Sequence, residues 1–207
     1  MRYLFDPSEL HAVVRRAIGL PSEQMIDQII GDLAARYPGH IATSKEWIFN
    51  NAGGAMGAMT ILHASLHEYV IIFGSPIGTE GHTGRFMADD YFMILEGEQW
   101  AFREGALERE VYRAGDVHHL PRGHVKAYKF PERCWAVEYA RGFIPQMLPF
   151  GLADSLFSTV DFRTIGRLFR IYGTQVMREL RQGNLPLQPN DIVALLPPWA
   201  RGEADVR

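Results

Sequence analysis

Two acidic sites in this 207-residue sequence lie beside or inside apolar stretches, where carboxyl groups could transfer protons. Glu138 lies within the apolar residues 134–140, and Asp89 and Asp90 directly precede the apolar residues 91–95. A buried, unpaired glutamate is rare. Two close carboxyl groups cannot both ionise cheaply, so one keeps its proton near neutral pH, as a general acid must. The structural alternatives are an exposed strand edge for Glu138 and a turn before a strand for Asp90.

A second set of residues suggests a metal site. Residues 115–123 fit the pattern G-x5-P-x-G that begins the second cupin motif, and the segment from His82 is similar to the first cupin motif. Cupins bind a metal with three histidines and one carboxylate. Here Gly84 and Lys126 stand at two of the histidine positions, so only His82 and Asp90 remain. Because a metal site needs three or four convergent ligands, we expect no metal and no other cofactor.

Another pair of histidines has the spacing of helical metal ligands. His63 and His67 are four residues apart, which would place them on one face of a helix. The residues around them alternate as in a strand, so we expect a hairpin instead. In a hairpin both histidines would be structural, and Glu68 would accept hydrogen bonds from amides of the turn.

The elements that must position these residues come in the order helices, strands, helices. Asp6 and Pro7 predict the start of a first helix, which Gly19 ends, and a second helix begins near Ser22. From about residue 47 the pattern has period two, with glycines between short β-branched and aromatic runs, which is typical of a sandwich or barrel. After residue 145 helical periodicity returns, with Asp161 as the cap of the last helix.

The composition limits the classes of protein and partner. Apolar residues make up 47% and aromatic residues 12% of the chain, enough for a large core or an aromatic cavity. The net charge of -3 does not suggest nucleic acid, and a single cysteine excludes an internal disulfide. We find no signal peptide and no run of about 20 apolar residues that could span a membrane.

These patterns together predict a mainly β chain with flanking helices, in the α+β class. We expect a cupin-like β-barrel with N-terminal helices and two C-terminal amphipathic helices. The expected parts are N-terminal amphipathic helices (1–46), the barrel (47–142), the C-terminal helices (143–182) and a tail (183–207).

Longer segments of the chain resemble a known family. Residues 47–59 (WIFNNAGGAMGAM), 62–69 (LHASLHEY), 78–85 (GTEGHTGR) and 135–142 (WAVEYARG) closely resemble the sigma receptor and C-8 sterol isomerase family. The resemblance covers about residues 38–181. The isomerase branch is the more similar one, because ADDYF and GEQW (starting at Ala88 and Gly97) match fungal enzymes better than the receptor.

The resemblance implies a buried carboxylate, at Glu138, that faces a cationic amine in the receptor or a sterol carbocation in the enzyme. The receptor's second acidic residue falls on Phe92 here. We expect Asp90 to replace it, because alternation places Asp90 on the same strand face as Phe92, with Asp89 as the neighbouring alternative. The family also implies a homotrimer with C-terminal helices on a membrane surface. Family members usually carry an N-terminal membrane helix, where this chain has amphipathic helices.

The walls of the expected cavity must be apolar, both to dissolve a sterol and to exclude water. The resemblance places eight lining residues at Met59, Ile61, Tyr69, Ile71, Phe73, Phe86, Phe92 and Tyr172. Alternation independently places Tyr69, Ile71 and Phe73 on one strand face.

Three functions from different classes follow. The first is a sterol isomerase that moves a double bond from C8=C9 to C7=C8 by carboxyl-mediated protonation and deprotonation. The second is a non-enzymatic, receptor-like binder of sterols or hydrophobic amines, and the third is a metal-dependent cupin enzyme. The pair of Asp89 and Asp90 favours the first, since a receptor needs only one anionic anchor. We expect an intracellular, peripheral membrane protein.

Overall fold

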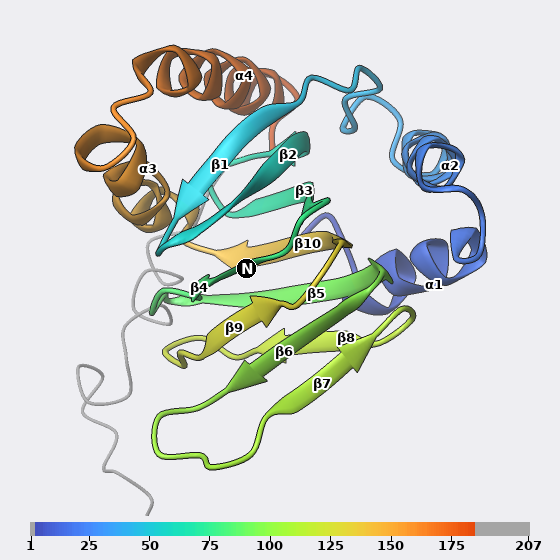
Figure 1. Cartoon of the computed structure of the whole chain (residues 1–207). Coiled ribbons are helices and arrows are strands. Elements are labelled where there is room, and N and C mark those ends of the chain that lie inside the picture. The colour runs from blue at the N-terminus through green and yellow to red at the C-terminus, as the bar shows by residue number, and fades with distance from the viewer. Residues whose placement is uncertain (1–2, 185–207) are drawn as a thin grey trace, which may run out of the picture.

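The computed structural model describes residues 3–184, so most of the expected tail lies outside the described residues. The chain begins with two helices, continues with the strands, and its last two described elements are again helices (Figure 1). The bounds are α1 (Pro7–Ala17), α2 (Ser22–Arg36), β1 (Ile48–Ala52), β2 (Ala55–Ala64), β3 (Glu68–Ser75), β4 (Thr79–His82), β5 (Ala88–Glu96), β6 (Glu98–Phe102), β7 (Glu110–Arg113), β8 (Val117–Leu120), β9 (Ala127–Phe130), β10 (Cys134–Gly142), a 3-10 turn (Ile144–Met147), α3 (Leu148–Phe157) and α4 (Phe162–Arg181).

The helix starts follow the sequence signals. The Asp6 carboxylate accepts hydrogen bonds from the backbone N–H groups of Ser8 (2.8 Å) and Glu9 (3.2 Å), and Pro7 is the first residue of α1. Asp161 caps α4 by accepting from the N–H of Thr164 at 3.0 Å. Both predicted caps are confirmed.

The strands form two antiparallel sheets rather than one closed barrel. The larger sheet has the order β1-β2-β3-β10-β5-β8, and the smaller one β4-β9-β6-β7. The β1–β2 hairpin turns at Gly53 and Gly54, whose φ angles of 62° and 85° fit a tight two-residue turn. The α+β class is confirmed, and the cupin-like arrangement takes the form of two sheets around a cavity.

The larger sheet is buried on both faces, which explains why its central strands are almost continuously apolar. On its outer face, side chains such as Val137 and Ile72 join one core with the apolar faces of α1 and α2. On its inner face, alternate residues such as Ala136 and Phe73 belong to a second core, which also includes Ile171 of α4. The strands β3, β10 and β5 therefore separate a solid core from the face that lines the cavity.

The C-terminal helices cover one end of the inner face, over β1 and β2 (Figure 1). The Gln175 amide of α4 donates to the carbonyl of Ile61 at 3.0 Å. The Asp154 carboxylate of α3 accepts from the N–H of Gly54 at 2.9 Å. These polar contacts between side chain and backbone fix both helices on the sheet. Among the described residues, no helix is long and apolar enough to cross a membrane.

Glu68 holds the N-terminal segment on the outer face. Its fully buried carboxylate accepts from the N–H groups of Leu4 (2.8 Å) and Phe5 (3.2 Å) and from the Tyr139 hydroxyl (2.7 Å). The expected structural role holds, but the amides come from the chain start rather than from the adjacent turn. His63 is structural too, because its Nδ1 lies 2.9 Å from the carbonyl oxygen of His40.

Removing one donor from the Glu68 carboxylate should destabilise the protein. We predict that Tyr139→Phe lowers the free energy of unfolding by about 1–3 kcal/mol, because a buried carboxylate and the carbonyl of Phe5 both lose a partner. Urea denaturation measures the change. Tyr91→Phe is the matched control, since the hydroxyl of this half-buried residue accepts from Arg141 and bonds to no buried carboxylate, and it should cost about 1 kcal/mol at most. Equal losses for both variants would contradict this account of Glu68.

Candidate active site

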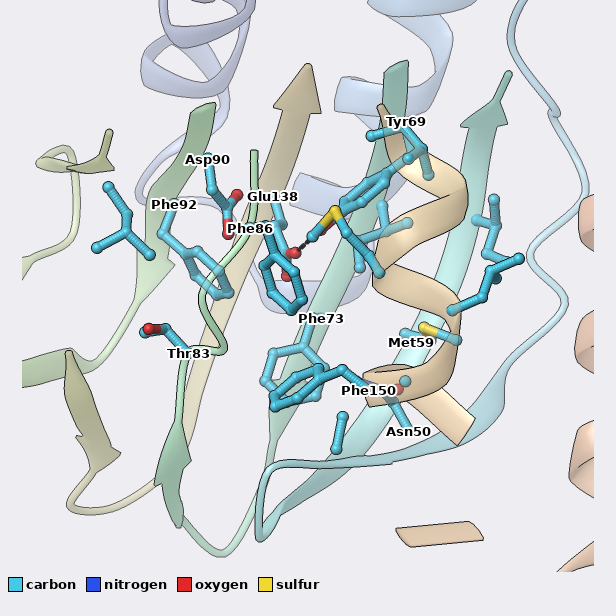
Figure 2. Close-up of a pocket in the computed structure, with 18 of the residues that line it drawn as sticks. Asn50, Met59, Tyr69, Phe73, Thr83, Phe86, Asp90, Phe92, Glu138 and Phe150 are labelled. Carbon is cyan, nitrogen blue, oxygen red and sulfur yellow. Dashed lines mark hydrogen bonds between the residues drawn. The ribbon is translucent and has the colours of Figure 1, made fainter. Parts of the chain in front are cut away.

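A cavity lies between the two sheets and is closed at one end by α3 and α4. About 1120 Å³ between its lining residues, counting the open mouth, is free of atoms. All eight lining residues expected from the sequence border this cavity, as do Glu138 and Asp90 (Figure 2). The wall is mostly aliphatic and aromatic, so charged groups inside it are poorly solvated.

Glu138 stands in the middle of the larger sheet, on the cavity face of β10. Its neighbours across the strands are Ile71 and Phe92, so apolar side chains flank the carboxylate on both sides. The Tyr69 hydroxyl donates a hydrogen bond to its Oε1 (Figure 2). Burial raises the pKa of Glu138 to about 7, although the hydrogen bond from Tyr69 acts in the opposite direction. The exposed-edge alternative is excluded, because β10 is a central strand.

Asp90 enters the cavity one row away on β5. It pairs with Ala140, two residues after Glu138, so the acids are diagonal neighbours on one face, with Cα atoms roughly 7–8 Å apart. Figure 2 shows both carboxyl groups directed into the same part of the cavity. Asp90 is buried, and no group within residues 3–184 forms a hydrogen bond with its Oδ1. Burial and then the charge of Glu138 raise the pKa of Asp90 well above its usual range.

Asp89 points away from the cavity. Its carboxylate accepts from the Arg122 side chain at 3.0 Å and from the backbone N–H of Arg122 at 3.2 Å, and it lies 3.7 Å from His119. Burial alone would raise the pKa of Asp89, but the hydrogen bonds from Arg122 hold it below its usual value. The structure therefore brings Asp90 to Glu138 and leaves Asp89 in an ion pair on the other face.

The residues of the cupin metal pattern do not converge. His82 borders the cavity, but its Nδ1 accepts from the N–H of Gly84 at 3.0 Å. The Lys126 ammonium is buried and pairs with Glu110 at 2.5 Å. Within residues 3–184, no three metal-binding side chains gather in one place.

Several residues of the cavity wall were not predicted from the sequence. His118, Gln99 and Tyr128 reach the cavity from β8, β6 and β9, and Phe150 reaches it from α3. No signal in the sequence marked the pair of His118 and Gln99, because each has another polar residue beside it, His119 and Glu98. The sequence did not give the register of β8 and β6, so it could not place them together.

The family comparison agrees with this geometry. The family model described as "ERG2 and Sigma1 receptor like protein" matches residues 1–184. The chain belongs to this family. Two similar proteins are C-8 sterol isomerases of Aspergillus fumigatus (54% identity, 86% of this chain and 76% of the relative) and Gibberella zeae (52% identity, 88% and 79%). The sigma non-opioid intracellular receptor 1 of Gallus gallus is 42% identical over 86% of this chain and 81% of its own length.

Solved structures with weak similarity are cupins and related proteins. An RmlC-like cupin of Shewanella frigidimarina has a TM-score of 0.40 and 18% identity, and covers 49% of this chain and 89% of its own. A putative ethanolamine utilization protein of Salmonella typhimurium has a TM-score of 0.38 and 18% identity, and covers 48% of this chain and 98% of its own.

The hydrogen bond from Tyr69 should set the pH dependence of cation binding. A hydrophobic tertiary amine, protonated throughout the assay range, binds better to ionised Glu138, so its affinity should fall as pH drops through about 7. Tyr69→Phe removes the interaction that lowers the pKa, so this midpoint should move to higher pH. Titration of amine affinity against pH measures it.

Tyr172→Phe is the matched control for this change. Tyr172 borders the same cavity, but its hydroxyl donates to the carbonyl of Ser65 at 3.2 Å. Its variant should keep the midpoint of the parent protein. An unshifted midpoint in Tyr69→Phe would mean that its hydroxyl does not control the ionisation of Glu138.

Proposed function

We propose that this protein is a sterol C-8 isomerase, which moves the ring double bond from C8=C9 to C7=C8. The observation that carries the proposal is the pair of carboxyl groups, Glu138 and Asp90, on one face of a mainly apolar cavity. Relatives named C-8 sterol isomerase, about half identical over most of both chains, support the same reaction.

The reaction needs one proton added and one removed. A carboxylic acid protonates C9 of the C8=C9 bond, which leaves a tertiary cation at C8. A carboxylate then takes the proton from C7, and the C7–H electron pair becomes the new C7=C8 bond. The proton count of the enzyme is therefore restored at the end of each turnover.

Glu138 and Asp90 suit these steps because together they hold one proton near neutral pH. Burial disfavours ionisation of both groups, and the charge of either one disfavours ionisation of the other. The protonated group can act as the acid, while the ionised group stabilises the cation in a medium with little water. Tyr69 orients the Glu138 carboxyl group through its hydrogen bond.

The alternative is a receptor-like protein that binds amines or sterols without reaction. The sigma receptor relative, at 42% identity, favours it. A single anion is sufficient to hold an amine, whereas burying Asp90 without a hydrogen-bond partner at Oδ1 costs free energy that amine binding does not require. Because the receptor also carries a second acidic residue, the higher identity to the isomerases (54% against 42%) is what favours the enzyme over the binder.

Turnover of a C8=C9 sterol tests the proposal directly. The purified protein should form the C7=C8 isomer, identified by mass spectrometry. Glu138→Gln should abolish the product, a loss of at least about 100-fold, and weaken binding of a hydrophobic tertiary amine. Asp90→Asn should lower turnover and shift the pH profile, because the shared proton is lost.

Asp89→Asn is the matched control for both acids, since Asp89 lies outside the cavity, and its folded variant should keep normal turnover. Tight amine binding by a parent protein that never forms the isomer would favour the receptor-like alternative. Unchanged amine affinity in folded Glu138→Gln would exclude Glu138 as the anion.

Peripheral attachment to a membrane through α3 and α4 is the second part of the proposal. Phe157 and Phe162 at the junction of these helices are 86% and 63% exposed, and Phe169 of α4 is 53% exposed. Exposed aromatic side chains on an amphipathic helix suit the lipid interface. Arg167 and Arg170 both contact Glu46, so these two arginines tie α4 to the chain before β1, whereas Arg163 is exposed.

We predict that vesicles of phosphatidylcholine with phosphatidylserine retain the protein at low salt, and that high salt weakens this retention. Phe157→Asp combined with Phe162→Asp should release it, because charged side chains enter the interface poorly. Ile77→Asp is the control, since Ile77 is 83% exposed in the turn between β3 and β4. Pelleting of vesicles measures both.

A parent protein that stays in the supernatant would contradict attachment and would suggest that oligomer contacts cover the same helices. The homotrimer that the family resemblance implies stays a prediction.

A further inference from the structure

One polar group of the cavity has no role in the proton transfer proposed above. His118 of β8 borders the cavity, yet only 2% of its surface is exposed, and its Nε2 has no hydrogen-bond partner among the residues that the structure describes. An unpartnered, buried polar nitrogen costs free energy. Since no group of residues 3–184 bonds to it, a partner for Nε2 would have to come from a ligand or a water in the cavity that His118 borders.

The ring of His118 is held in one orientation from two sides. Its Nδ1 lies 2.7 Å from Oε1 of Gln99, which comes from β6 of the other sheet. The ring also stacks on Tyr112, with centroids 4.4 Å apart and planes 17° from parallel. Burial, and then the nearby charge of Lys126, lower the pKa of His118 to about 4, so the ring is neutral at pH 7.

These contacts decide which nitrogen can serve a ligand. The carbonyl oxygen of Gln99 accepts a hydrogen bond, so the ring proton lies on Nδ1, and Nε2 keeps a free lone pair. A lone pair on a neutral ring, surrounded by apolar walls, suits a hydroxyl donor. A lone pair does not stabilise an anion, and a cation is better stabilised by the carboxyl groups of Glu138 and Asp90.

The sheet places this acceptor at a defined distance from the carboxyl pair. Glu138 pairs with Phe92, and Phe92 pairs with His118, so the three residues form one row across β10, β5 and β8. Two strand spacings separate the ends of the row, roughly 10 Å. In a sterol, about two fused rings separate the hydroxyl-bearing carbon from the reacting carbons, and the Glu138 side chain spans the rest.

We propose that Nε2 of His118, oriented by Gln99, accepts a hydrogen bond from the ring hydroxyl of the sterol. This inference rests on the proposed function and adds the group that sets the position of the substrate along the cavity. The hydroxyl lies at β8, the first two rings lie over Phe92, and the reacting carbons meet Glu138 and Asp90. The apolar side chain of the sterol then extends over β3 and β2 toward α3 and α4.

Binding of two steroidal amines tests the proposal without turnover. One probe is a steroid with a protonated amine in its ring system and a hydroxyl on the first ring, and the other lacks only this hydroxyl. The parent protein should bind the hydroxylated probe about tenfold more tightly, as expected for one buried hydrogen bond. His118→Leu should abolish this preference and keep the affinity for the deoxy probe, which also reports that the variant is folded.

Two further variants sharpen the result. Gln99→Leu should reduce the preference, because the ring of His118 loses its orienting partner. His119→Leu should keep it, because His119 is the next residue of β8 and stacks on Tyr91, outside the cavity.

A full preference in folded His118→Leu would overturn the proposal. So would a preference that Asp90→Asn removes and His118→Leu leaves intact, since Asp90 would then be the anchor. Failure of the isomerase proposal gives a different result, namely a hydroxyl preference that depends on His118 in a protein that never converts a C8=C9 sterol.

Discussion

The main physical constraint on this structure is that carboxyl groups in the middle of a β-sheet are buried away from water. Ionising Glu138 in its apolar surroundings is unfavourable, which is why its pKa rises to about 7 from an ordinary value of 4.5. The folded state therefore binds this proton more tightly than the unfolded chain does. Its contribution to stability is complete below about pH 4.5 and is lost as the pH rises through 7. A cation in the cavity offsets this loss, which links fold stability to the proposed carbocation chemistry.

The free-energy cost of burying Glu138 is offset by the apolar core on the other face of the same strands. On β10, Val137 and Tyr139 point outward into the core under α1 and α2, while Glu138 between them points into the cavity. The Tyr139 hydroxyl bonds to Glu68, so a second buried carboxylate holds the chain start on the outer face. Adjacent residues of one strand thus serve stability and chemistry separately, which is a consequence of period-two alternation.

The two ends of the cavity differ in polarity. At the β8 edge, the hydrogen bond between His118 and Gln99 joins the larger sheet to the smaller one. At the other end, Leu168 and Tyr172 of α4 present an apolar wall above β1 and β2. A sterol matches this difference in polarity. Its hydroxyl would lie at the polar end and its side chain at the apolar end, and the carbocation would form between them. The proposed attachment to a membrane lies on the side of this apolar end, since α3 and α4 carry the exposed aromatic side chains.

The sequence by itself predicted the order of helices, strands and helices, the caps at Asp6 and Asp161, and the family resemblance with its carboxylate at Glu138. These features are local or are carried by long, specific segments, so no knowledge of distant contacts was needed. Alternation along one strand also placed Asp90 on the face of Phe92, because the side-chain period of a strand is fixed.

Only the tertiary structure decided which strands are neighbours, and therefore which acids meet. Pairing of β10 with β5 brings Asp90 beside Glu138, while Arg122, far along the chain, holds Asp89 on the other face. The row that ends at His118 depends on the register of β8 against β5, and its contact with Gln99 depends on the packing of two sheets. These contacts join residues that are far apart in the sequence. The local sequence does not reveal which strands pair or in which register, because packing of the whole core sets the pairing.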